Sequence, residues 1–336
     1  MSNNQPFHNG MPLNNDRDAM SQNNVRNTMP QNNEPAAAVQ ARQHRYPVAG
    51  NNQYEGQLVD GHIHTELCPH GSGDKVALII EKAIELGFYK LCITEHAPLP
   101  VGFSKRYKGD EEGLTTASLR MDQVEPYLAL GNELQREYGQ HINLSVGFEV
   151  DFLPGFEAAT QEFLNMVGPY TGENLLSVHF MQGANDGFWC LDYSEAEFEK
   201  AFGSYLQKQD VLFRRYFELV LQAVQTDFGP HTPVRIGHID VIKKYQKYFN
   251  FTSSYDQQTQ QVIMNILRTL KVQNRTLDYN VSGVFKENCG EMYPSPFIQG
   301  MAYVLGVPFM MGSDSHSLSA FVKAGVSKGN IIEKLI

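Results

Sequence analysis

The chain has 336 residues, of which 42% are hydrophobic, so it can bury the core of one large domain or of two modest ones. Its formal net charge of -10 argues against a protein that binds nucleic acid through a broad basic surface. The four cysteines form no CxxC pair, no apolar run approaches the roughly 20 residues of a membrane span, and the first residues lack a signal-peptide pattern. We therefore expect a soluble cytoplasmic protein that binds neither membranes nor nucleic acid.

The first 55 residues differ in composition from the rest of the chain. They are dominated by Asn, Gln, Pro and Ala and contain few branched aliphatic side chains. Such a segment cannot bury enough apolar area to offset the entropy lost on ordering. We predict a disordered tail over 1–55 that takes no part in the chemistry, followed by one catalytic domain over 56–336.

Apolar runs of strand length alternate with amphipathic helical stretches from residue 57 onward. Strands are predicted within 57–64, 89–96, 142–152, 174–180, 234–241, 276–283 and 308–316. Helices are predicted within 73–88, 122–138, 195–225, 255–273 and 295–305. This alternation predicts parallel strands covered by helices, as in an α/β barrel or a doubly wound sheet.

Histidines and acidic residues gather at the ends of the predicted strands. His62 and His64 lie two apart on an extended segment, so both rings face the same side and can share one cation. The full set at strand ends, or in the loop just after one, is His62, His64, His70, His96, Glu149, His179, His238, Asp314 and His316. In a barrel these ends converge on one face, where active sites form.

This donor set suits Zn, Mn or Fe, because it combines imidazoles with carboxylates and contains no thiolate. Seven histidines and two carboxylates are too many for one ion, so the sequence predicts two or three divalent metal ions. Ions roughly 3.5–4 Å apart are the arrangement that clamps both oxygens of a phosphoryl displacement.

Motifs in chain order resemble the PHP (polymerase and histidinol phosphatase) superfamily. They read DGHIHTELCPHG, ITEHAPLP, GFEVDF, SVHF, RIGHID and GSDSH. The more specific motifs are similar to those of the histidinol-phosphatase branch of that superfamily; they read CPHGS, TEHAPLP, GHIDVIKKYQK and CGEMYPSP. The resemblance covers about Val59 to His316.

The resemblance implies a distorted (β/α)7 TIM-like barrel with a trinuclear metal site. It places the first metal on His62, His64, Glu149 and Asp314. It places the second on His70, His96 and His316, and the third on His179 and His238 with Glu149 bridging to the first. It also implies hydrolysis of L-histidinol phosphate to L-histidinol and phosphate, in histidine biosynthesis, by attack of a hydroxide that bridges the metals.

Further residues have roles that the sequence leaves open. Glu95 and Asp240 lie next to or two residues from predicted ligands, so each is expected either to protonate the leaving group or to orient a ligand, His96 for Glu95 and His238 for Asp240. Lys243, Lys244 and Lys286 are the expected phosphate contacts. In the resembling branch an arginine commonly stands where this chain has Phe285, which leaves the exact substrate preference open.

Three other functions compete with this interpretation. A PHP phosphoesterase acting on another small monoester, or on nucleic-acid ends, is the nearest, although the acidic charge disfavours a nucleic-acid substrate. A metal-loaded binding protein without turnover would be expected to lack some ligands. An amidohydrolase-like barrel also opens with HxH but would carry a bridging lysine where Glu149 stands.

Overall fold

The structure is a computed structural model that describes residues 57–332, so the predicted tail over 1–55 lies outside the described residues. Seven parallel strands form one sheet in the order β1-β2-β3-β4-β7-β8-β9. Their bounds are β1 Val59–Ile63, β2 Lys90–His96, β3 Asn143–Asp151, β4 Leu175–Ser177, β7 Arg235–Ile236, β8 Thr276–Asn280 and β9 Phe309–Gly312. All seven lie within the predicted segments.

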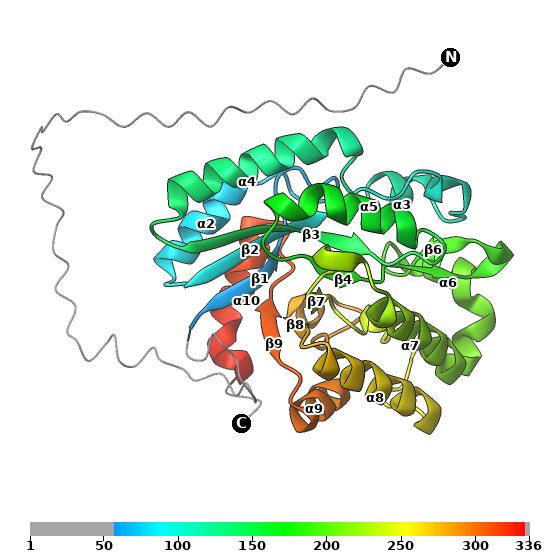
Figure 1. Ribbon diagram of the computed structural model, residues 1–336. Coiled ribbons are helices and arrows are strands. Elements are labelled where there is room, and N and C mark those ends of the chain that lie inside the picture. Colours follow the sequence, from blue (N-terminus) through cyan, green and yellow to red (C-terminus); the bar gives the residue numbers. More distant parts are fainter. Residues whose placement is uncertain (1–56, 333–336) are drawn as a thin grey trace, which may run out of the picture. The chain divides into compact units, whose positions relative to one another are not determined.

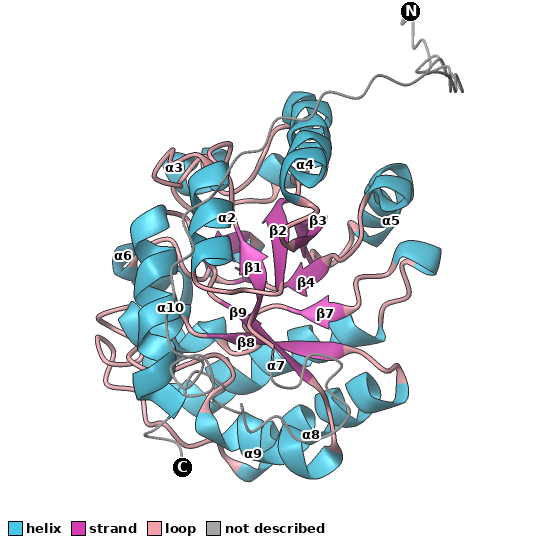
Figure 2. Ribbon diagram, turned by 90° about the vertical axis from the view of Figure 1, so that its left-hand side faces the viewer, coloured by secondary structure: helices cyan, strands magenta, loops and turns pink. Residues whose placement is uncertain are grey.

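The two edges of this sheet meet beyond the end of β9. Ile63 pairs in parallel with Ser315, and the His64 amide donates to the Ser315 carbonyl at 3.0 Å. The sheet is therefore a nearly closed barrel of seven strands (Figure 2). This confirms the barrel over the doubly wound alternative.

Helices surround the strands on the outside of the barrel (Figures 1 and 2). They are α2 Val76–Glu85, α3 Glu111–Thr115, α4 Val124–Tyr138, α5 Glu157–Val167, α6 Glu195–Phe202, α7 Gln209–Gln225, α8 Gln257–Val272, α9 Pro296–Leu305 and α10 Leu318–Ile332. The single helix predicted over 195–225 is wrong in one respect, because a 3-10 segment over Gly203–Lys208 separates α6 from α7. No helix in the described range is long and apolar enough to cross a membrane.

Local sequence explains where several of these helices begin and end. Asp256 accepts a hydrogen bond from the Thr259 amide at 2.8 Å and so caps the first turn of α8. Gly306 ends α9 at φ +67°, a left-handed conformation that glycine adopts without the steric penalty of a Cβ.

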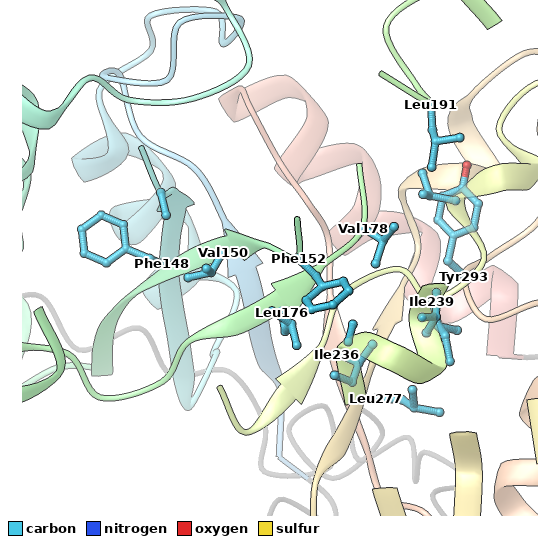
Figure 3. Packing of buried hydrophobic residues seen from close by; sticks show 14 of the residues in the cluster. Phe148, Val150, Phe152, Leu176, Val178, Leu191, Ile236, Ile239, Leu277 and Tyr293 are labelled. Atoms are coloured by element: carbon cyan, nitrogen blue, oxygen red, sulfur yellow. The ribbon is translucent and has the colours of Figure 1, made fainter. Parts of the chain in front are cut away.

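The main core lies between the strands and this ring of helices. Phe148, Phe152, Leu176, Ile236 and Leu277 belong to it, and Figure 3 shows how such side chains from successive strands pack together. A second cluster gathers around an antiparallel hairpin of β5 Phe180–Gln182 and β6 Phe188–Cys190, which sequence patterns did not predict. The hairpin follows directly on the predicted ligand His179.

A buried ionic cluster joins strands at the end of the barrel opposite the predicted ligands. Arg235 is the first of the two residues of β7 and is 1% exposed. Its Nη2 donates to the Gly61 carbonyl at 2.6 Å, and its Nη1 lies 3.7 Å from Glu173 Oε2. Lys90, at the start of β2, also donates to the Glu173 carboxylate. One carboxylate thus connects two basic side chains that belong to different strands.

Candidate metal centre

All nine predicted donors lie at or just beyond the C-terminal ends of the barrel strands. His62, His96 and Glu149 belong to the strands themselves, and His64 follows β1 directly. His179, His238 and Asp314 each follow the end of a strand by two residues. The barrel architecture therefore brings together groups that are up to 254 positions apart along the chain, from His62 to His316.

Glu149 stands at the centre of this group. Its Oε2 atom lies 3.0 Å from His62 Nε2, 3.6 Å from His64 Nε2 and 3.3 Å from His96 Nδ1. Its Oε1 atom lies 2.9 Å from His238 Nε2 and 3.5 Å from His179 Nε2. The two oxygens of one carboxylate thus face two separate sets of imidazoles, which is the geometry of a bridging ligand.

The remaining donors close the group on its outer side. Asp314 Oδ1 lies 3.4 Å from His64 Nε2 and 3.8 Å from His62 Nε2. His70 Nε2 and His316 Nε2 approach to 2.9 Å, and the His64 and His316 rings stack with centroids 4.0 Å apart.

Protein acceptors hold the outward nitrogens of five of these histidines. His62 Nδ1 lies 2.8 Å from Asp278 Oδ2, His64 Nδ1 lies 3.2 Å from Glu95 Oε1, and His179 Nδ1 lies 2.9 Å from Asp151 Oδ1. The same role falls to the Thr116 carbonyl for His70 and to the Asp314 carbonyl for His316. Each contact turns Nε2 toward the centre, as carboxylates and carbonyls commonly do for metal-binding histidines.

The electrostatics of the centre keep its carboxylates charged. Burial alone raises the pKa of Glu149, but His62, His179 and His96 together hold it well below its usual range. Burial alone lowers the pKa of His64, yet the neighbouring carboxylates of Asp314 and Glu95 raise it to about 9. The ionised carboxylates of Glu149 and Asp314 attract cations.

Several buried nitrogens in the centre have no hydrogen-bond partner. His64 Nε2 and both ring nitrogens of His96 are among them, and these residues are 1% and 7% exposed. A buried polar atom without a partner carries a desolvation penalty, which a metal ion removes by taking the lone pair. Nitrogen and carboxylate atoms of His62, His64 and Glu149, and likewise of His96, Glu149 and His179, lie within 4.8 Å of one another. The residues present therefore fit divalent cations.

A further donor group includes a thiol that the sequence patterns did not single out. His64, His96, His316 and Cys68 also hold their donor atoms within 4.8 Å of one another. His64 thus lies close to donors predicted for the first metal and to donors predicted for the second metal. The division of the nine ligands among three metals stays a prediction.

A cavity of about 510 Å³ opens onto the donors. Its lining includes five of the predicted ligand histidines together with Asp314, and it also includes Lys244, Lys286, Asp192 and Tyr293. Burial raises the pKa of Asp192, but Lys244, His179 and His238 hold it below its usual range, so this carboxylate is charged. A cavity of this size is typical of sites for small molecules.

Some of the residues predicted to act as the general acid or to contact the phosphate line this cavity, and others lie outside it. Lys244 and Lys286 line it, whereas Lys243 is fully buried and pairs with Glu291. Glu95 bonds to His64 and Thr65, which agrees with an orienting role, although for His64 rather than for His96. Phe285 lies outside the lining, and Lys323 Nζ stands 4.8 Å from the centroid of its ring.

Asp240 occupies a different position from the one its spacing suggests. Its carboxylate accepts hydrogen bonds from the Tyr255 hydroxyl at 3.1 Å and from the Ser295 amide at 2.8 Å, and it does not line the cavity. Among the described contacts none joins it to His238, whose Nδ1 has no partner. The 3-10 turn over Val241–Lys243 begins directly after Asp240, which does not cap it through its side chain.

Three residues with a part in the centre were missed by the sequence patterns. Asp278 orients His62, Asp192 lines the cavity, and the Ser177 hydroxyl donates to Glu149 Oε1 at 2.6 Å. Asp278 could have been predicted from the sequence, because it is an acidic residue of the predicted strand 276–283. Asp192 follows the hairpin that was not predicted, and no sequence pattern indicated a functional role for it.

Comparison with known proteins agrees with this geometry. The PHP domain family matches residues 60–282. A histidinol-phosphatase of Bacillus subtilis (strain 168) is 31% identical over 260 residues, which are 77% of this chain and 94% of that protein. The crystal structure assigned to a histidinol phosphatase of Listeria monocytogenes superimposes with a TM-score of 0.77 and 37% identity, covering 80% of this chain and 99% of the other.

A more distant structure shares the fold. Histidinol phosphate phosphatase of Lactococcus lactis subsp. lactis, crystallised with zinc, L-histidinol and phosphate, superimposes with a TM-score of 0.57 and 20% identity. The match covers 83% of this chain and 93% of that one.

Proposed function

This chain belongs to the PHP family, in its histidinol-phosphatase branch, and from that premise we propose that it hydrolyses L-histidinol phosphate to L-histidinol and phosphate. The activity uses several divalent metal ions, and the Lactococcus relative binds zinc. The reaction places the protein in histidine biosynthesis, as its relatives' names imply.

One observation carries this proposal. Glu149 offers its two oxygens to two sets of histidines at 2.9–3.6 Å, and members of both sets line a cavity that suits a small ester. Bound divalent ions supply Lewis acidity to the phosphoryl oxygens and lower the pKa of a coordinated water. We assign them to the predicted ligand sets, with Glu149 shared between the first and the third.

The chain's own residues then position the ester. Lys244 and Lys286 line the cavity beside the donors and offer positive charge to the phosphoryl oxygens. Glu95 holds the His64 ring and acts as a positioning residue, since its carboxylate is engaged by His64 and Thr65 and does not line the cavity. Asp240 is bonded to Tyr255 and Ser295 and does not line the cavity.

Phosphate release from L-histidinol phosphate, measured beside a panel of other small monoesters, tests the substrate. Metal content is determined on the same sample, before and after chelation. We expect histidinol phosphate to have the highest kcat/KM and chelation to abolish turnover. A higher kcat/KM on another monoester would contradict the substrate, and turnover that survives complete metal removal would contradict the metal centre.

The variants Glu149→Ala and His179→Ala test the shared site. Each removes a predicted ligand, so we expect loss of bound metal together with a fall in kcat of at least about 100-fold. His141→Ala is the matched control, because His141 is exposed and lies away from the strand ends. Full turnover in either site variant would refute the shared centre.

A further inference from the structure

We propose that Asp192 and the hydroxyl of Tyr293 form a subsite for the substrate's ammonium group. The inference rests on the proposed function, because it concerns the amino alcohol part of the same ester. Asp192 follows the β5–β6 hairpin and Tyr293 follows β8, yet both side chains line the cavity that contains the metal donors.

The Tyr293 hydroxyl lacks an oxygen or nitrogen partner although its side chain is buried. Tyr293 is 2% exposed, and among the described residues only the weakly hydrogen-bonding thiol of Cys289 interacts with its oxygen. Burying a hydroxyl without a partner costs roughly 1–3 kcal/mol, so such a group in a cavity wall indicates a ligand that completes it.

The ring of Tyr293 is held rigidly. Its backbone exchanges two hydrogen bonds with Asn280 of β8, at 2.9 and 2.6 Å, and its ring lies edge-on to His238 with centroids 6.3 Å apart. In Figure 3 the ring stands between Ile239 and Leu191, with its oxygen directed away from Ile239. The hydroxyl is therefore fixed in place before any ligand arrives.

Asp192 is the carboxylate of the cavity best able to accept a new donor. Asp151 is engaged by the ring and amide of His179, Asp314 belongs to the metal centre, and Glu112 is an exposed acceptor of the Tyr193 hydroxyl. Asp192 Oδ2 lies 3.3 Å from Lys244 Nζ, while its Oδ1 receives only the weak thiol donor of Cys190.

The charges of the cavity match those of an amino alcohol phosphate. The phosphate end carries negative charge and faces the histidine centre and the two lysines. An ammonium brings three donors, and it enters a buried cavity without penalty only where acceptors replace its water. The Asp192 carboxylate and the Tyr293 hydroxyl oxygen supply two such acceptors.

Steady-state kinetics on paired esters tests the subsite. Wild type, Asp192→Asn and Tyr293→Phe are each measured with L-histidinol phosphate, 2-aminoethyl phosphate and ethyl phosphate. The last two esters form the matched pair, because they differ by an amino group alone. We expect Asp192→Asn to raise KM for both amine-bearing esters about tenfold or more, and Tyr293→Phe about fivefold, with KM for ethyl phosphate changed less than twofold.

Three results would overturn the subsite. These are an equal rise of KM for all three esters, an unchanged KM for the amine-bearing esters, and a loss of bound metal in Asp192→Asn, which would make Asp192 a ligand. Tyr255→Phe and Asp256→Asn, at positions outside the cavity, control for general loss of a buried hydroxyl or a carboxylate. Wild-type preference for 2-aminoethyl phosphate over histidinol phosphate would remove the proposed substrate while leaving the ammonium subsite standing.

Discussion

At the scale of single residues, the centre depends on side chains that touch other side chains rather than the metals. Asp278 is fully buried and meets His62 Nδ1 at 2.8 Å, while His62 Nε2 points at Glu149. Such a partner fixes the tautomer and the direction of the imidazole, and it strengthens the ring as a donor. Ligand identity alone therefore does not set the metal affinity of this site.

The variant Asp278→Asn tests this orienting role. It keeps the shape of the side chain and removes its charge, so we expect the affinity for zinc to fall about 10–100-fold, the range typical of such partners. Zinc titration against a competing chelator measures this.

Glu197→Gln is the matched control for Asp278→Asn. Glu197 is a buried carboxylate that accepts from Tyr107 and Cys190, away from the donors. We expect that variant to lower stability and to keep its zinc affinity. Equal zinc affinity of Asp278→Asn and wild type would refute the orienting role.

At the scale of elements, the barrel strands are short, and ionic contacts at their N-terminal ends add to their pairing. β7 has two residues, and Arg235 of that strand reaches Glu173 on the segment before β4 and the carbonyl of Gly61 in β1. Burial raises the pKa of Glu173, but Arg235 and Lys90 lower it further, so the folded pKa lies below the usual value. A carboxyl with a lowered folded pKa stabilises the fold above its unfolded pKa.

Glu173→Gln is expected to destabilise the protein most near neutral pH. Removing one partner leaves Arg235 and Lys90 buried without their counter-charge, at a cost of about 3–5 kcal/mol in the free energy of unfolding. As pH falls from about 4.5 through the lower folded pKa, wild-type Glu173 is itself protonated and the difference narrows.

Urea unfolding of the metal-free proteins at pH 7 and at pH 4 measures this difference, since metal loss then does not contribute. The exposed Glu133→Gln on α4 serves as control and should shift neither curve. A difference in unfolding free energy that stays constant between the two pH values would contradict the ionic role of Glu173.

At the scale of the whole molecule, the metal centre connects the C-terminal ends of six of the seven barrel strands. Its donors come from β1, β2 and β3 and from the segments after β4, β7 and β9. A ligand that binds only the folded state raises stability with its concentration. Metal bound here therefore stabilises the fold as a whole.

Removal of the metals should lower the melting temperature by several degrees, because one bound ion at 100 times its Kd contributes about 2.7 kcal/mol. Thermal unfolding with zinc, and after chelation and dialysis, measures the change. The double variant His62→Ala/His64→Ala removes two ligands of the first predicted site and should show a smaller rise of melting temperature with zinc than wild type. A melting temperature independent of zinc in wild type would contradict metal binding to the folded state.

Deletion of residues 2–55 is expected to leave kcat/KM within about twofold, because all nine predicted donors lie between His62 and His316. The deletion variant is compared with the full chain by phosphate release and thermal unfolding. A large loss of activity would give the segment a role that its composition does not suggest.

The sequence by itself was sufficient to locate the strands along the chain and to predict the donors. Apolar runs marked each of the seven parallel strands, and histidines and acids stood where those runs ended, because a parallel barrel gathers its strand ends on one face. The PHP resemblance, carried by motifs such as GFEVDF and GSDSH, named the family that the comparisons confirm.

Only the tertiary structure decided which neighbours of the donors reach the cavity. Glu95 and Asp240 both stand close to ligands in sequence, yet Glu95 bonds to His64 whereas Asp240 turns to Tyr255 and Ser295. Lys244 lines the cavity and the adjacent Lys243 is buried against Glu291. Side-chain direction in short turns depends on packing with distant segments, and periodicity along the chain carries no information about those contacts.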